Sequence, residues 1–242
     1  MESMSEWLKV IVMAVIQGIT EFLPVSSSGH LVLAKHFLRL ESPGVVLEVV
    51  LHAGTLVSIL VYYRRRILEL AGQVLAGKAE GWQYAMAVAA GTVPAVLAYG
   101  VAGKRIEDAF DDPRGVCMML CITGVILLSL VKPIGGGPKD IGILRGLWIG
   151  VAQALALFPG ISRSASTITA GRHLGLSPDK AAEFSLLLAI PALALETSVT
   201  YFTIPGEMIA ALARVVTVTN HSTQTLDVEM MDGLPQVNPY GM

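Results

Sequence analysis

Glutamine, glutamate, serine, histidine and arginine side chains gather in two polar stretches, residues 17–30 and 153–167, of an otherwise apolar chain. In the first stretch Gln17 and Glu21 are four residues apart, which places both on one face of a helix. A proline interrupts that helix, and three serines and His30 follow it. Carboxylate, hydroxyl and imidazole groups in this order indicate a site for acid–base or nucleophilic chemistry.

The second stretch combines the features of an anion site. A Pro-Gly turn at residues 159–160 precedes Ser162, which can cap the next helix, and Arg163 lies in its first turn, where the helix dipole repels a cation. A bound anion would compensate, and arginine recognises phosphate oxygens in a bidentate manner. Ser26 or Ser27 can cap the corresponding helix of the first stretch. Two helix N-termini with one arginine and one glutamate predict an anion site with a place for a metal ion or a base.

A structural alternative exists for each of these residues. Hydroxyl side chains in membrane helices often satisfy only the backbone, and Glu21 and Arg163 could form a buried ion pair without chemistry. Buried ionisable groups cost several kcal/mol unless they are partnered. Because several such groups coincide, a functional site is the favoured interpretation.

The two stretches repeat each other at an offset of 136 residues. The matched pairs are Gln17 with Gln153, Ser26 with Ser162, and Ser28 with Ser164. This repetition predicts two half-sites that meet to form one site. At an offset of 135 residues Glu48 matches Glu183, each five residues after a Ser-Pro pair, and we interpret both as supports that hydrogen-bond the opposing hairpin.

The composition is that of an integral membrane protein. Of 242 residues, 53% are hydrophobic and 15% are charged, whereas soluble domains carry about 25% charged residues. Four apolar runs are each near the roughly 20 residues that span the hydrocarbon core as a helix: residues 45–63, 82–103, 115–131 and 181–204. No basic tract suggests a nucleic-acid partner.

The segments around the polar stretches are too short to span a bilayer. We predict that each forms a re-entrant helical hairpin, whose non-helical tip is tolerated at membrane depth where protein surrounds it. Three spanning runs lie between the hairpins, so the second enters from the opposite face. The expected fold is an all-α polytopic membrane protein, an inverted repeat with two re-entrant hairpins that meet at the bilayer midplane. Its membrane domain covers residues 1–204, with repeat one at 7–131 and an incomplete repeat two at 141–204, and residues 205–242 form a polar, disordered tail.

Charges orient this arrangement. Basic residues follow the first and third spans, whereas acidic residues accumulate after the second, and basic loops favour the cytoplasm. The basic residues are Arg64, Arg65, Arg66, Lys78, Lys132, Lys139 and Arg145. The first hairpin is therefore expected to open outward and the second inward.

The motifs resemble those of the undecaprenyl-diphosphatase family, the bacitracin-resistance membrane phosphatases. Residues 17–21 match its (Glu/Gln)-x-x-x-Glu motif, residues 23–30 its Leu-Pro-x-Ser-Ser-(Ser/Thr)-Gly-His motif, and residues 159–167 its Pro-Gly-x-Ser-Arg-Ser-x-x-Thr motif. The resemblance covers roughly residues 5–204. It implies an enzyme of the plasma membrane that hydrolyses a C55 polyprenyl diphosphate to the monophosphate and inorganic phosphate, recycles the lipid carrier for cell-wall synthesis and confers bacitracin tolerance.

The resemblance also assigns roles to residues. Its catalytic positions correspond to Glu21, Ser27, His30 and Arg163, and its divalent cation, Mg²⁺ or Ca²⁺, to Glu21 with Gln17. The hydroxyls and glycine nearby are expected to bind substrate: Ser26, Ser28, Gly160, Ser162, Ser164 and Thr167. The nucleophile stays open between Ser27, His30 and a water that His30 activates. The substrate's apolar tail would lie in lipid, the site would open to the extracytoplasmic side, and the partners allowed are the lipid, the bilayer and a second copy of the chain.

Two expectations run against full activity as this enzyme. Inverted repeats with helix ends at the midplane are also typical of transporters, so a carrier for lipids or anions, such as a flippase, is the alternative. The family continues with further spanning helices, whereas residues 207–242 provide none. We therefore predict weak or no phosphatase activity unless another chain supplies those helices.

Overall fold

The computed structural model describes residues 5–40, 46–131, 140–202, 227–231 and 234–238. The chain divides into two compact units, Met1–Thr200 and Tyr201–Met242. Each unit is described by itself.

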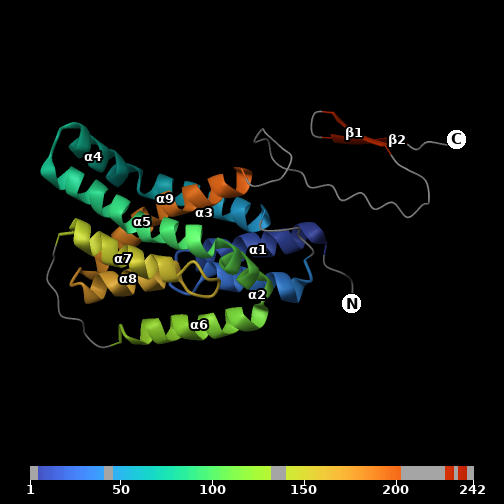
Figure 1. Ribbon diagram of the computed structural model, residues 1–242, viewed down its shortest axis with the longest axis horizontal. Coiled ribbons are helices and arrows are strands. Elements are labelled where there is room, and N and C mark those ends of the chain that lie inside the picture. Colours follow the sequence, from blue (N-terminus) through green and yellow to red (C-terminus); the bar gives the residue numbers. More distant parts are fainter. Residues whose placement is uncertain (1–4, 41–45, 132–139, 203–226, 232–233, 239–242) are drawn as a thin grey trace. The chain divides into compact units, whose positions relative to one another are not determined.

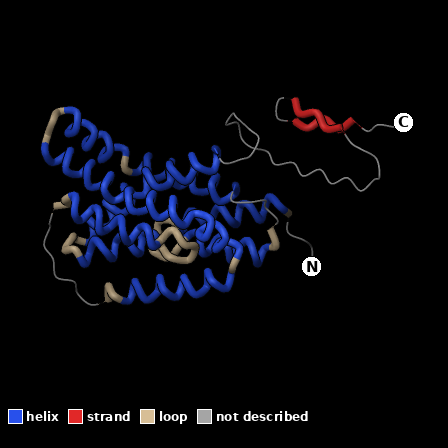
Figure 2. The backbone as a smooth tube through the Cα atoms, in the orientation of Figure 1, coloured by secondary structure: helices blue, strands red, loops and turns tan. Residues whose placement is uncertain are grey.

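The first unit is helical, as predicted from the apolar runs (Figures 1 and 2). Its elements are α1 (Glu6–Thr20), α2 (Ser27–Leu38), α3 (Val46–Tyr62), α4 (Arg64–Leu75), α5 (Ala79–Asp108), a 3₁₀ turn η1 (Ala109–Asp111), α6 (Pro113–Leu128), α7 (Ile143–Leu155), α8 (Arg163–His173) and α9 (Pro178–Phe202). The predicted spanning runs correspond to α3, α5, α6 and α9. Lys132 and Lys139, which entered the charge argument, and the Ser-Pro pair at 42–43 lie outside the described residues.

One helix was not expected from the sequence. The basic residues Arg64–Arg66 begin α4 instead of a loop, and α4 bends by 69° from α3 at Tyr63. Among the described residues, the helix Ala79–Asp111 is long and apolar enough to cross a membrane by itself. The bent pair α3–α4 would add a second crossing if it counts as one span.

Two helical hairpins, α1–α2 and α7–α8, contain the polar stretches. The arms of each hairpin pack against each other, and α6 contacts both α2 and α8. Helix α5 packs tightly along α7, because glycines face each other there: a methyl group added at Gly150 would lie 2.2 Å from the carbonyl oxygen of Gly91. This close packing holds the second hairpin firmly to the long helix.

Large apolar side chains cover the outside of the helices in the first unit. Trp7 on α1 is 81% exposed, Trp148 on α7 is 56% exposed, and Val101 on α5 is 91% exposed. Soluble monomers rarely present apolar surface on this scale. An apolar exterior around a polar interior is the arrangement expected of a protein that is solvated by lipid.

The second unit contains an antiparallel hairpin. Strand β1 (Asp227–Met231) pairs with β2 (Leu234–Asn238), and Asp227 lies opposite Asn238. The sequence predicts disorder over residues 205–242, whereas these ten positions are described as strands. The remaining residues of that predicted tail beyond position 202 lie outside the described residues.

Candidate active site

The two hairpin tips have the same local structure. At the first tip the Ser26 hydroxyl accepts a hydrogen bond from the backbone N–H of Gly29 at 3.3 Å and lies 3.3 Å from the Ser28 hydroxyl. The second tip repeats both contacts at 3.2 Å, made by Ser162, Ala165 and Ser164. Ser26 and Ser162 are therefore the N-caps of α2 and α8, and the sequence repeat is a repeat of capping geometry.

The tips touch each other through glycines. Gly160 has φ +96°, and a methyl group there would lie 2.6 Å from the carbonyl oxygen of Val116. A methyl group at Gly29 would lie 2.8 Å from the Cα atom of Gly160. Both positions therefore require glycine, and the N-termini of α2 and α8 are brought together at this contact.

Glu21 forms the centre of the site. Its Oε1 atom accepts a hydrogen bond from Arg163 Nη2 at 2.5 Å, and its Oε2 atom accepts from Ser27 Oγ at 2.5 Å and from Gln17 Nε2 at 3.2 Å. The Glu21 side chain is 5% exposed and that of Arg163 is 20% exposed. The ion pair joins residues 142 positions apart, so the predicted chemical groups of the two stretches do converge.

His30 lies one turn into α2, and its ring is held in a defined tautomer. Its Nδ1 atom is 2.7 Å from the backbone oxygen of Ser26. A carbonyl oxygen only accepts hydrogen bonds, so Nδ1 carries the hydrogen. In the neutral ring Nε2 then has a free lone pair and can act as a base or a nucleophile.

The other predicted binding residues lie around the second tip. The Ser164 hydroxyl donates to the backbone oxygen of Leu23 at 3.3 Å and so links the two hairpins. Thr167 is buried and lies 2.6 Å from the hydroxyl of Ser185 on α9. Thr167 therefore contributes to packing between α8 and α9 in this structure.

Two hydroxyl residues of the site were missed by sequence reasoning. Thr123 on α6 donates to the carbonyl oxygen of Gly160 at 2.7 Å and accepts from the backbone N–H of Ser162 at 2.9 Å. Thr55 on α3 accepts a hydrogen bond from Gln17 Nε2 at 3.5 Å. A threonine within a long apolar run was the available signal, but it does not tell which loop the residue supports.

The predicted role of Glu48 and Glu183 is wrong. Glu48 forms an ion pair with Lys35 at 3.2 Å, on the second arm of its own hairpin, and Glu183 pairs with Arg66 at 3.0 Å. Neither contact reaches the opposing hairpin. Each glutamate pairs with the cation that packing brings closest, and periodicity along the chain cannot identify that cation.

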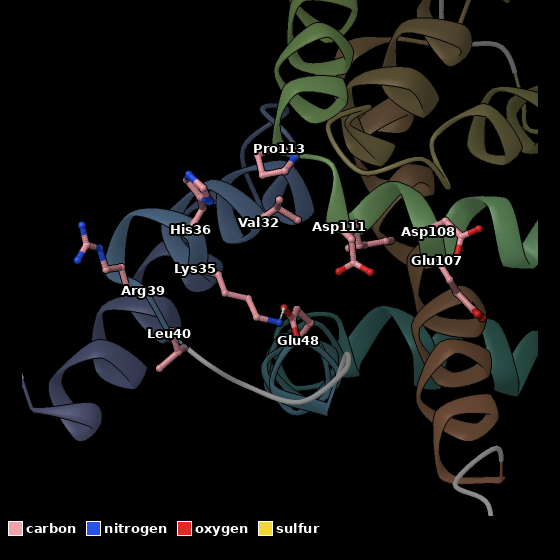
Figure 3. A pocket seen from close by; sticks show the side chains of 11 residues that line it. Val32, Lys35, His36, Arg39, Leu40, Glu48, Glu107, Asp108, Asp111 and Pro113 are labelled. Carbon is pink, nitrogen blue, oxygen red and sulfur yellow. Dashed lines mark hydrogen bonds and ion pairs between the residues drawn. The ribbon is translucent and has the colours of Figure 1, made fainter.

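A separate pocket of about 900 Å³ lies at the far end of α2 (Figure 3). Lys35 points across it to Glu48, and acidic residues on α5 and η1 form the facing wall: Glu107, Asp108 and Asp111. No predicted catalytic residue lines this pocket. Its mixed charges balance each other more than they select an anion, so we place the functional site at the hairpin tips.

The donor set at the tips limits how a metal ion could bind. Within the described residues there is no group of three or more histidine, cysteine, aspartate or glutamate side chains that could hold a metal ion. The Oε1 atom of Gln17, however, is buried and has no hydrogen-bond partner beside Glu21. One carboxylate and one free amide oxygen fit an oxygen-ligated cation that takes its other ligands from a bound phosphate, as Mg²⁺ commonly does.

The fold and the site together define a helical membrane protein with a buried, ion-paired site at two helix N-termini. The chain matches the sequence model of the family described as "Bacitracin resistance protein BacA" over residues 10–226. It belongs to this family. The match extends beyond residue 204, where the resemblance was expected to end, and includes part of the region predicted to be atypical.

Individual relatives agree with this assignment. An undecaprenyl-diphosphatase of Desulfosudis oleivorans is 40% identical over 204 residues, which cover 78% of this chain and 74% of the relative. One of Geobacter sulfurreducens is 42% identical over 76% of this chain and 71% of its own. One of Idiomarina loihiensis is 37% identical over 85% of this chain and 80% of its own.

Proposed function

We propose that this protein hydrolyses undecaprenyl diphosphate to undecaprenyl monophosphate and inorganic phosphate. The observation that carries the proposal is the Glu21–Arg163 ion pair at two joined helix N-termini, in a chain whose relatives are named undecaprenyl-diphosphatases. The reaction regenerates the lipid carrier for cell-wall synthesis and accounts for the family's link to bacitracin resistance. The names of the relatives favour hydrolysis over the transport alternative.

Diphosphate binding follows from the charges at the tips. Arg163 and the free N–H groups of α2 and α8 provide positive potential for phosphate oxygens. When Arg163 binds phosphate, its hold on Glu21 weakens, and the carboxylate becomes a better proton acceptor. Substrate binding thus prepares the base, and the same guanidinium stabilises the charge that develops on the phosphate oxygens.

The geometry favours Ser27 as the nucleophile. Its hydroxyl already donates to Glu21, so Glu21 takes the proton while Oγ attacks the terminal phosphorus. The bond from that phosphorus to the bridging oxygen breaks, and the lipid monophosphate leaves with the bridging oxygen. A water molecule, deprotonated by His30 Nε2, then hydrolyses the phosphoserine and releases inorganic phosphate.

A divalent cation, Mg²⁺ or Ca²⁺, would be held by Glu21 and by the free Oε1 of Gln17, with substrate phosphate oxygens completing the shell. When bound, it would neutralise phosphate charge. Gln17 lacks charge, so Glu21 supplies the carboxylate ligand.

The membrane arrangement is part of the proposal. Short hairpins with polar tips, repeated capping geometry and an apolar exterior support two re-entrant hairpins in an inverted repeat of a multi-pass plasma-membrane protein. Acidic residues after α5 and basic residues at the start of α4 support a site that opens to the extracytoplasmic side. A homo-oligomer stays a prediction.

Phosphate release from undecaprenyl diphosphate by the detergent-solubilised full chain tests the function. We expect turnover that Glu21→Ala and Arg163→Ala abolish, whereas Asp140→Asn, at an exposed ion pair on the surface, leaves it unchanged. Acid-quenched enzyme should contain phosphoserine in His30→Gln protein and none in Ser27→Ala protein. Phosphohistidine in its place would assign the nucleophile to His30, and lipid binding without phosphate release would support the transport alternative.

A further inference from the structure

The side-chain amide of Gln17 is buried and asymmetrically bonded. Gln17 is 1% exposed. Its Nε2 group has two hydrogens, and both have acceptors: Glu21 Oε2 at 3.2 Å and Thr55 Oγ1 at 3.5 Å. Its Oε1 atom has no partner. A buried acceptor that is left open costs free energy, so it requires an explanation.

Thr55 determines which way round this amide sits. The Thr55 hydroxyl has a single hydrogen, which it donates to the backbone oxygen of His52 at 2.8 Å. It can therefore only accept from Gln17. If the amide were flipped, Oε1 would face the carboxylate of Glu21 and the lone pairs of Thr55, and both contacts would become repulsive. The two acceptors together allow one orientation.

We propose that Thr55 is a positioning residue of the active site, which acts through Gln17 to aim the free Oε1 atom at the space beside Glu21. The inference rests on the proposed function for what occupies that space, a phosphate-bound cation or a water molecule. Thr55 is 5% exposed and lies on α3, outside both hairpins, so it makes no contact with substrate in this assignment. Its role is to prevent the amide from rotating, which preorganises a neutral ligand that would otherwise have two orientations.

Kinetics of phosphate release test the role through the order in which groups act. Thr55→Val keeps the shape and removes the hydroxyl, and we expect it to lower kcat/KM by about fivefold, in keeping with the loss of one hydrogen bond, and to raise the cation concentration needed for half-maximal rate. Thr55→Ser should restore both values. Thr92→Val on α5, which removes a hydroxyl bonded only to the backbone oxygen one turn earlier, is the matched control and should change neither.

A double-mutant cycle separates positioning from general packing. In Gln17→Ala protein the Thr55→Val change should alter kcat/KM by less than about twofold, because the residue through which Thr55 acts is absent. An undiminished effect in that background would overturn the proposal. If Thr55→Val protein does not fold, Thr55→Ala replaces it in the cycle.

Nuclear magnetic resonance of the side-chain amide tests the inference independently of catalysis. In protein labelled with ¹⁵N-glutamine, the Gln17 signals are identified by their loss in Gln17→Ala. We expect two inequivalent protons that exchange slowly with water, and in Thr55→Val protein one of them should shift and exchange at least about tenfold faster. Unchanged signals would refute the role of Thr55 even if the enzyme is active, and the expected change would support it even if no phosphatase activity is found.

Discussion

The Glu21–Arg163 ion pair predicts a large stability effect that other ion pairs of this chain lack. Arg163→Met would leave the Glu21 carboxylate 5% exposed with only Ser27 and Gln17 as donors. Removing one partner of a buried pair costs about 3–5 kcal/mol. Because Arg163 is 20% exposed, the lower end applies, and we expect about 3 kcal/mol of lost stability.

A double-mutant cycle with Glu21→Gln isolates the pair. We expect the two single changes to exceed the double change by a coupling energy of about 2 kcal/mol. Arg66 and Glu183, each 33% exposed, form the internal control and should couple by less than about 1 kcal/mol. Unfolding in mixed micelles at graded denaturant gives both values.

Salt sharpens the comparison. Raising ionic strength from 0.1 to 1 M shortens the screening length from about 10 to about 3 Å. The coupling of the exposed pair should fall toward zero, whereas that of Glu21 and Arg163 should persist because protein surrounds it. Equal coupling for the two pairs, or equal loss with salt, would refute the conclusion that the hairpin tips form a shielded site.

Three further predictions concern packing at the tips and along α5, each measured by thermal unfolding in detergent. Gly160→Ala forces a side chain into a left-handed position against α6 and should cost more than about 2 kcal/mol, whereas Gly124→Ala, which meets nothing within 4 Å, should be near neutral. Thr123→Val leaves a buried carbonyl of the second tip without its donor and should cost about 1–3 kcal/mol and weaken phosphate release. Gly150→Ala should separate α5 from α7 and destabilise the protein strongly, and the result would contradict the packing if Gly100→Ala, a position with open space, were equally harmful.

Much of the site could be predicted because its groups lie close together in sequence. A hydroxyl residue after a proline, followed by an apolar helix, fixes a cap within one turn, and Ser26 and Ser162 both act in this way. The pairing of Glu21 with Arg163 followed from two half-sites with complementary charge. Local rules of capping and periodicity were sufficient for these features.

The contributions of α3 and α6 could not be predicted. Thr55 and Thr123 reach the tips only because their helices pack beside the hairpins, and no local rule states which helices become neighbours. The same limit explains the error over Glu48 and Glu183, whose partners are set by tertiary packing. Helix α4 was missed because its amphipathic, basic sequence resembles a polar loop in an apolar chain.

The unlike residues at matched positions of the two hairpins constrain how this protein can arise from a duplicated half. At the offset of 136 residues Glu21 matches Leu157, and Ser27 matches Arg163. Two copies of the first hairpin would bring two carboxylates face to face, and two copies of the second would bring two guanidinium groups together. Neither symmetric pair could form the neutral, hydrogen-bonded centre seen here. The site is therefore a property of heterologous halves, and a dimer of identical half-proteins could acquire it only after its two subunits were free to diverge.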